Sequence, residues 1–341
     1  MSDHSFGFFM TTGLPFDDFR NLLRGLPRAD EAPADAARAR LGELAPDGSL
    51  GALAGIAVWL ARASQRMPPL VSRPQLALFA GTHGLVAHDV SARAPSWTAA
   101  MVEHCAAGGA AINQACLAED VALKVFDLAL DLPTGDISRD VAFDERDCAA
   151  TMAFGMEAAS ADTGLLVLGD FSVGGAVAAS CVLAALHGGS GRDWGSAATR
   201  AGDAPGDQAE TVIDAALGCH RGHLRDPLEV LRRVGGREIA AIAGAIVSAR
   251  VQNIPVILDG LASLAAAAVL HALNAEAVTH CRLAASAPDG PPADVSERIA
   301  LRPVLAAQNI PGGGIAGTLA VGMVRTAALC LSGMRPMPAP A

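Results

Sequence analysis

The chain has 341 residues, which is near the upper limit for one hydrophobic core. Hydrophobic residues make up 51% of it and charged residues 18%, and this composition excludes intrinsic disorder for the bulk of the chain. The net charge of −10 at pH 7, without any basic run, excludes a nucleic-acid surface, which would need clustered Lys and Arg.

No stretch is apolar over the length of about 18 residues that a membrane-spanning helix requires. Asp170 interrupts the apolar run 165–186, and Asp259 interrupts 254–270. Residues 1–9 lack the basic start and apolar run of a secretory signal. The 7 cysteines are scattered, without a Cys-x-x-Cys pair, which is typical of reduced thiols. We therefore expect a cytoplasmic protein that does not bind membranes.

The section before about residue 70 is predicted to be mostly helical. After it, short apolar runs alternate with longer Ala-rich stretches of helical spacing. Continuously apolar runs are typical of parallel strands covered on both faces, and such strands need crossover helices. The alternation predicts an α/β fold with a doubly wound, mostly parallel sheet and flanking helices. The predicted strands are 76–80, 121–126, 165–168, 256–258 and 277–281. The predicted helices include 99–119, 148–159, 176–186, 238–249 and 262–273.

Two further segments have a clear local prediction. The stretch 190–207 is rich in Gly, Ala and charge, and it is predicted to be a long loop. Asp226 followed by Pro227 predicts a helix start, because the carboxylate caps the first amides and proline fits the first helical position.

Small or polar residues follow four of the five predicted strands. In an open parallel sheet, ligands bind beyond the carboxyl ends of the strands, so these residues predict a pocket at that edge. The four strand ends are the run 81–84 (Gly-Thr-His-Gly), Asp127, the pair Gly169-Asp170 and the pair Asp259-Gly260.

Two glycine clusters precede predicted helices. Gly174-Gly175 precedes the helix 176–186, and the run 312–314 (Gly-Gly-Gly) precedes a helix at about 317–331. Free amides at a helix start can bind a phosphate, but glycine can equally serve a tight turn, and both interpretations stay open. Residues 312–317 match Gly-x-Gly-x-x-Gly, but no strand precedes them, so we reject a dinucleotide site.

Other motifs are weaker, and they predict neither a metal nor a cofactor. The segment 170–174 resembles a nucleophile elbow, but its first glycine comes one residue too early. Cys219, His220 and His223 lack a second pair of ligands and are interpreted as loop residues. The acidic stretch 127–147 is interpreted as a solvated loop surface.

A distinctive run covers residues 225–239 (Arg-Asp-Pro-Leu-Glu-Val-Leu-Arg-Arg-Val-Gly-Gly-Arg-Glu-Ile), followed by 243–245 and 254–260 (Ile-Pro-Val-Ile-Leu-Asp-Gly). It resembles the nicotinate-nucleotide:dimethylbenzimidazole phosphoribosyltransferases of cobalamin nucleotide-loop assembly. The resemblance extends from about residue 40 to about residue 332. Further matches lie at 48–51, 83–84, 90–92, Thr98 and Asp127.

The resemblance implies a large α/β domain at 71–284, a smaller helical domain built from 1–70 and 285–341, and a homodimer. The implied reaction is a pentosyl transfer, in which phosphoribosyl moves from nicotinate mononucleotide to a benzimidazole nitrogen. The implied partners are therefore a nucleotide and an aromatic base, with no cofactor or metal. The implied substrate- and phosphate-binding residues are Thr82, His83, Ser91, Asp170, Gly174, Gly175, Asp259, Gly312, Gly313 and Gly314.

The chain departs from the family pattern at the site itself. Gly313 stands where the family has its catalytic glutamate, and glycine has no group that accepts a proton. One hypothesis is an active transferase in which another group, Asp170 first and Glu238 or water otherwise, replaces that base. The alternative is a non-catalytic or altered-substrate paralogue that binds a nucleotide or base. The other departures are Thr82 for an aspartate, Asp170 for a glutamate, 175–177 (Gly-Ala-Val) for Asn-Thr-Thr, and Ala209 for a lysine.

Overall fold

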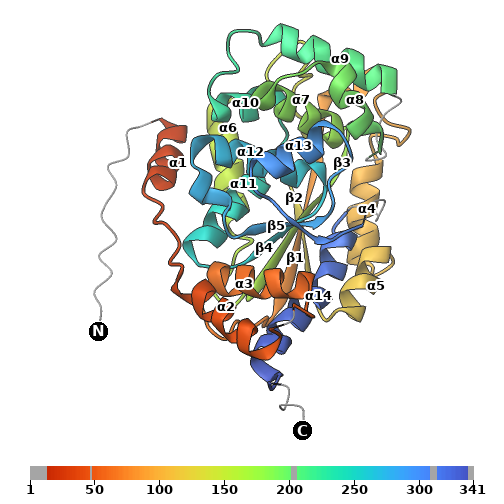
Figure 1. Cartoon of the computed structure of the whole chain (residues 1–341). Helices are drawn as coiled ribbons and strands as arrows, with labels where there is room; N and C mark the ends of the chain where they lie inside the picture. The colour runs from red at the N-terminus through yellow and green to blue at the C-terminus, as the bar shows by residue number, and fades with distance from the viewer. Residues whose placement is uncertain (1–13, 47, 201–205, 308–312, 337–341) are drawn as a thin grey trace.

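The computed structural model describes residues 14–46, 48–200, 206–307 and 313–336. Within them, a parallel sheet of six strands in the order β2-β1-β3-β4-β5-β6 has helices on both faces (Figure 1). The strand order reverses at β1, with β2 on one side and β3 on the other, which places a topological switch point there. The strands are β1 (Pro74–Thr82), β2 (Ala122–Asp127), β3 (Leu165–Val173), β4 (Val256–Leu258), β5 (Cys281–Ala285) and β6 (Pro303–Leu305).

Helices alternate with the strands along the chain, as crossover connections require. The described residues also include two short 3-10 helices. η1 (Gly84–His88) follows β1, and η2 (Ala275–Val278) precedes β5. The α-helices are α1 (Pro15–Arg24), α2 (Ala32–Leu44), α3 (Ala52–Ser64), α4 (Trp97–Ala106), α5 (Ala111–Ala118), α6 (Glu145–Met156), α7 (Gly175–His187), α8 (Gly191–Arg200), α9 (Gly206–Cys219), α10 (Pro227–Val234), α11 (Arg237–Val251), α12 (Gly260–Leu273), α13 (Pro291–Arg298) and α14 (Ile315–Gly333).

The central strands are buried on both faces, so successive residues enter two separate cores. Phe79 and Leu168 pack in the core under α6, α7, α11 and α12. Leu78 and Val167 pack in the opposite core, under α3, α4, α5 and α14. Small side chains bring the helices close, since a β-carbon on Gly244 of α11 would collide with a backbone carbonyl of α6. The continuous apolar runs in the sequence follow from this double coverage.

The fold class and the first four predicted strands are confirmed, and the range 256–258 coincides with β4. The predicted strand 277–281 is wrong: residues 275–278 form η2, and the strand begins only at Cys281. The sequence pattern does not predict β6. The predicted helix 99–119 is divided into α4 and α5, because Gly108 between them has a left-handed φ of 77°.

The prediction of a loop at 190–207 is wrong. Residues 191–200 form α8, and α9 begins at Gly206. The stretch folds because Trp194 is 1% exposed and packs with Ala197 and Ala198 in the core, so a few apolar residues at helical spacing outweigh the polar composition. The predicted cap is confirmed, since the Asp226 side chain accepts the backbone N–H of Leu228 at 2.9 Å.

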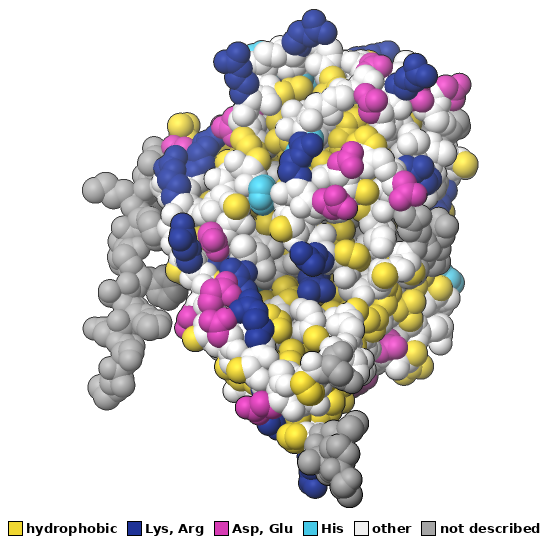
Figure 2. All heavy atoms as spheres, in the orientation of Figure 1, with side chains coloured by type: hydrophobic (Ala, Val, Ile, Leu, Met, Phe, Trp, Pro, Cys, Tyr) yellow, Lys and Arg dark blue, Asp and Glu magenta, His cyan; other side chains and the backbone are white. Residues whose placement is uncertain are grey.

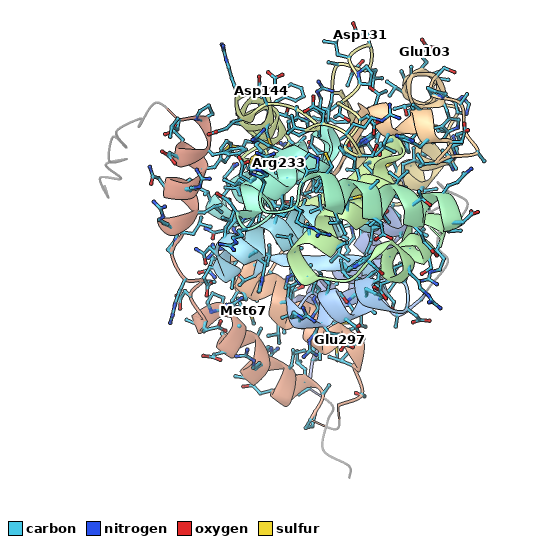
Figure 3. All side chains as sticks on the ribbon, turned by 90° about the horizontal axis from the view of Figure 1, so that it is seen from above. Met67, Glu103, Asp131, Asp144, Arg233 and Glu297 are labelled. Carbon is cyan, nitrogen blue, oxygen red and sulfur yellow. The ribbon has the colours of Figure 1, made fainter. Side chains whose placement is uncertain are left out.

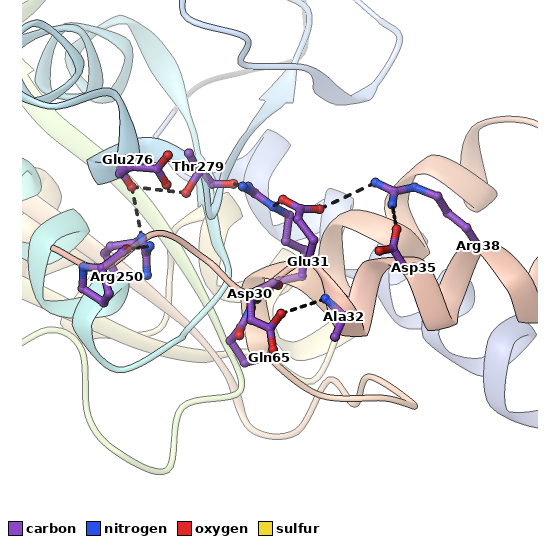
Figure 4. Close-up of polar contacts among 11 residues, drawn as sticks. Asp30, Glu31, Ala32, Asp35, Arg38, Gln65, Arg250, Glu276 and Thr279 are labelled. Atoms are coloured by element: carbon purple, nitrogen blue, oxygen red, sulfur yellow. Dashed lines mark hydrogen bonds and ion pairs between the residues drawn. The ribbon is translucent and has the colours of Figure 1, made fainter. Parts of the chain in front are cut away.

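The N-terminal helices pack on both cores. Phe16 of α1 lies in the core that contains α6, while α2 and α3 pack with α14. Polar contacts add to this packing: Arg62 of α3 forms an ion pair with Glu31 and donates to the carbonyl of Thr279, in the region drawn in Figure 4. The division into a large domain at 71–284 and a smaller domain from 1–70 and 285–341 stays a prediction. The strand β6, which extends the sheet, lies within 285–341.

α14 is the one helix in the described ranges that is long and apolar enough, by length and composition, to cross a membrane. Its buried residues, including Val321 and Val324, belong to the core shared with α3 and the sheet. Packing against these elements accounts for its apolar sequence. On the face shown in Figure 2, acidic and basic side chains are interspersed.

Candidate active site

A cavity of about 730 Å³ lies at the carboxyl ends of β3, β4 and β5, between these strand ends and the helices α4, α8 and α14. Its volume is in the range of small-molecule sites. The predicted position of the pocket, at the rim of the sheet, agrees with this finding. The lining residues are Arg93, Trp97, Met101, His104, Ala110, Ala111, Ile112, Asp170, Phe171, Ser172, Ala176, Ala197, Arg200, Leu258, Asp259, Gly260, Leu261, Ala262, Leu264, Leu283, Ala285, Ser286, Ala287, Pro288, Asp289, Gly313, Ile315 and Ala316.

Asp170 lies on β3 and lines the cavity together with Ser172, two residues further along the same strand. The Ser172 hydroxyl donates a hydrogen bond of 2.7 Å to Asp170 Oδ2. This bond fixes the orientation of the carboxylate. Asp170 is half-buried, so its carboxylate is partly accessible from the cavity.

Asp259 follows β4 and is 5% exposed. Its Oδ2 accepts the backbone N–H of Gly317 at 3.0 Å, and the amides of Gly314 and Ala316 also bond to the carboxylate. Burial raises the pKa of this carboxyl to about 6, and the hydrogen bonds from the three amides oppose that shift. Asp259 thus occupies the anion site that the amino terminus of α14 offers.

An aromatic wall closes one side of the cavity. Trp97 and Phe171 meet edge to face with centroids 6.2 Å apart, and the Arg93 guanidinium stacks over Trp97 at 4.1 Å. A β-carbon on Gly313 would lie 2.6 Å from Phe171 Cε1, and the φ of 68° at Gly313 also disfavours any other residue. The Phe171 ring therefore occupies the space of a side chain at position 313.

A third carboxylate, that of Glu238, lies outside the cavity lining. Glu238 is completely buried, and its Oε1 lies 3.0 Å from Nε2 of His83. Glycines enclose it: a β-carbon on Gly81 would lie 2.6 Å from Glu238 Oε2, and one on Gly236 would lie 2.7 Å from the same oxygen. The space that this carboxylate needs therefore explains Gly81, near the end of β1, and Gly236, just before α11.

The structure brings three of the predicted site residues, Asp170, Asp259 and Gly313, to the cavity. Six others lie outside its lining, and Gly312 lies outside the described residues. The hydroxyl of Thr82 donates to the carbonyl of Leu130 at 3.2 Å, and that of Ser91 accepts the amide of Arg93. The six are Thr82, His83, Ser91, Gly174, Gly175 and Gly314.

Several cavity residues are absent from the predicted set, and the errors in the secondary structure explain some of them. The segment 285–289 is missing because the predicted strand ends at 281, four residues before β5 ends at Ala285. Arg200 is missing because its helix is predicted to be a loop. Arg93 and Trp97 give no strand-end signal, since they come after the 3-10 turn that follows β1.

The motif at 219–223 and the acidic stretch 127–147 supply no residue to the cavity lining. His220 is buried, and its Nε2 lies 3.0 Å from the carbonyl oxygen of Ile137. Asp131 and Asp144 project from the periphery in Figure 3, and Asp144 accepts the amide of Asp147 as the cap of α6. Over residues 14–46, 48–200, 206–307 and 313–336, no three His, Cys, Asp or Glu residues are placed to hold a metal ion.

Comparison with known proteins gives the family. The phosphoribosyltransferase family model DBI_PRT matches residues 26–339. The chain belongs to the DBI_PRT family. It is 49% identical over 330 residues to the nicotinate-nucleotide–dimethylbenzimidazole phosphoribosyltransferase of Rhizobium meliloti, covering 95% of this chain and 96% of that protein. The enzyme of the same name from Agrobacterium fabrum is 48% identical over 330 residues, covering 95% of this chain and 94% of that protein.

Solved structures of similar proteins share the fold. The phosphoribosyltransferase of the same name from Thermus thermophilus superposes with a TM-score of 0.80 at 29% identity, covering 90% of this chain and 97% of that one. A structure of CobT from the same organism gives a TM-score of 0.79 at 29% identity, covering 89% of this chain and 96% of that one. The resemblance stated from the motifs at 225–260 is therefore confirmed for the family and the fold.

Proposed function

We propose that this protein transfers phosphoribosyl from nicotinate mononucleotide to a benzimidazole-type base in cobalamin biosynthesis, releasing nicotinate. The observation that supports this most is the identity of 49% across almost the full length of an enzyme with that name. The cavity at the rim of the sheet supports it as well, because it has the size and the mixed lining that a nucleotide and an aromatic base require.

In the proposed reaction, one ring nitrogen of the base attacks C1′ of the ribose. The bond from C1′ to the nicotinate nitrogen breaks, and its electron pair stays on nicotinate. The other ring nitrogen of the base then loses its proton to a carboxylate. Trp97 and Phe171 offer apolar surfaces against which a flat base can pack.

Asp170 is the proposed proton acceptor. Its carboxylate lines the cavity and is oriented by the Ser172 hydroxyl at 2.7 Å. Asp259 is less suited, because three backbone amides already bond to its carboxylate. Glu238 does not line the cavity. A homodimer and a cytoplasmic location belong to the same proposal.

The direct test is to incubate the protein with nicotinate mononucleotide and dimethylbenzimidazole and to measure free nicotinate and the ribazole phosphate by chromatography. Stoichiometric formation of both products is expected. Tight binding of nicotinate mononucleotide, measured by calorimetry, without any product would favour the non-catalytic paralogue instead. Gly313 motivates that alternative, although the similar proteins named above do not favour it.

A further inference from the structure

The cavity lining contains more carboxyl groups than arginines, and this is unfavourable for a substrate that carries a phosphate. Asp170, Asp259 and Asp289 supply carboxyl groups, whereas the cationic side chains in the lining are Arg93 and Arg200. A phosphate monoester carries between one and two negative charges at pH 7, and nearby carboxylates repel it. The 5′-phosphate of a nucleotide therefore needs a cation at this cavity.

Backbone amides offer little compensation at α14. Its first amides, those of Gly314, Ala316 and Gly317, already bond to the Asp259 carboxylate. A phosphate at this helix start would have to displace a buried side chain and leave it without hydrogen-bond donors, which costs free energy. Among the side chains that line the cavity, the two arginines are the candidates for binding the anion.

Arg200 and Arg93 differ in what they already contact. Arg200 ends α8, and its Nη2 donates to the carbonyl oxygen of Asp289 at 2.7 Å, which holds the side chain across from α8 to the segment after β5. The same Nη2 lies 3.4 Å from the Ser196 hydroxyl, and among the described residues Arg200 forms no ion pair with a carboxylate. The guanidinium of Arg93 stacks face-on against Trp97, and this contact assigns it to the aromatic wall.

We propose that Arg200 binds the 5′-phosphate of the nucleotide substrate. This inference rests on the proposed function and adds to it the residue that distinguishes a nucleotide from a nucleoside. A guanidinium held at one edge by Asp289 presents its other N–H groups in a fixed plane, which suits two parallel hydrogen bonds to phosphate oxygens.

The experiment compares nicotinate mononucleotide with nicotinate riboside, which lacks the phosphate. Dissociation constants are measured by calorimetry for the wild-type protein and for Arg200→Ala, Arg200→Lys and Arg93→Ala, and KM and kcat are measured for the nucleotide. Arg192→Ala is the matched control, because Arg192 lies exposed on the same helix but outside the cavity. Circular dichroism checks that each variant is folded.

For Arg200→Ala we expect nucleotide binding to weaken about ten- to a hundred-fold, as for the loss of charge-assisted hydrogen bonds, with riboside binding unchanged. Arg200→Lys should restore part of the loss, and Arg192→Ala should bind the nucleotide as the wild type does. Equal nucleotide binding by wild type and Arg200→Ala would overturn the inference and leave the proposed function intact. A phosphate-specific loss in Arg93→Ala instead would also overturn it. A wild-type protein that binds neither ligand would overturn the proposed function as well.

Discussion

The ring of Phe171 lies in the space that a side chain on Gly313 would need, with Cε1 2.6 Å from the position of the β-carbon. Phe171 is 8% exposed and packs against Trp97, so it cannot move aside without disturbing the aromatic wall. The residues at positions 171 and 313 are therefore sterically coupled: the large ring at 171 leaves no space for a carboxylate side chain at 313.

Gly313→Glu alone is therefore expected not to raise turnover, because the new side chain collides with Phe171 and requires a strained positive φ. The double variant Phe171→Ala/Gly313→Glu has space for the carboxylate and should release nicotinate faster than either single variant. The measurement is the initial rate of nicotinate release for all four proteins. A large gain in Gly313→Glu with Phe171 intact would contradict the steric coupling.

Asp170→Asn should lower kcat by about 10²- to 10⁴-fold, because the amide cannot accept the proton of the base. Ser172→Ala should have a smaller effect in the same direction, since it removes the 2.7 Å hydrogen bond that orients the carboxylate. Steady-state rates with saturating nicotinate mononucleotide measure both. Asp131→Asn, an exposed position outside the cavity, is the control and should keep the wild-type rate. An unchanged kcat in Asp170→Asn would assign the base elsewhere.

The buried carboxyl of Asp259 predicts a pH dependence of stability. Its pKa is raised from the ordinary 3.8 to about 6, so between these values the folded protein binds a proton that the unfolded chain has lost. The resulting stabilisation is complete below about pH 4 and is lost as the pH rises through about 6, a change of roughly 3 kcal/mol in the free energy of unfolding.

Urea unfolding of the wild type and of Asp259→Asn from pH 4 to pH 7 isolates this contribution from those of other carboxyls. The difference in the free energy of unfolding, wild type minus variant, should fall over that range. A difference that does not vary with pH would show that Asp259 titrates in the same way in both states.

The close packing of α6 and α11 predicts that replacing Gly244 and Gly42 by alanine changes the free energy of unfolding in opposite directions. Gly244→Ala should lower the free energy of unfolding by about 1–3 kcal/mol, because its β-carbon would collide with the Met152 carbonyl. Gly42→Ala should raise it by about 0.5–1 kcal/mol, because that helical position is exposed, with no heavy atom within 4 Å of the β-carbon. Denaturant unfolding measures both, and equal effects would contradict the packing seen here.

Three of the four strands that are predicted correctly, β1, β3 and β4, are buried on both faces, and such burial leaves a continuous apolar run in the sequence. Prediction fails on the side of the sheet formed by β5 and β6, whereas β2 at the opposite edge is predicted although it is partly exposed. β6 has three residues, and β5 follows a 3-10 turn whose apolar residues resemble a strand. At such short elements the tertiary contacts, rather than the local pattern, decide the structure.

Site residues, like strands, can be predicted where a local sequence pattern marks them and not where tertiary contacts decide. Asp259 is predictable because it directly follows an apolar strand, and Asp170 because it comes two residues after the apolar run 165–168. The topology then brings both to one rim. The sequence cannot show that Gly314 and Ala316 donate their amides to Asp259, nor that Glu238 accounts for the glycines around it. Apart from the one between Glu238 and Gly236, those relationships join residues that lie far apart along the chain.

The last helix, α14, and the turn before it supply Gly313, Ile315 and Ala316 to the cavity and the amides that hold Asp259. The cavity can therefore form only after residues 313–317 have been synthesised. Chains that end before Ile315 would lack these cavity residues and also the buried residues, such as Val321 and Val324, that α14 contributes to the core. Such truncated chains are expected to bind neither the nucleotide nor the base.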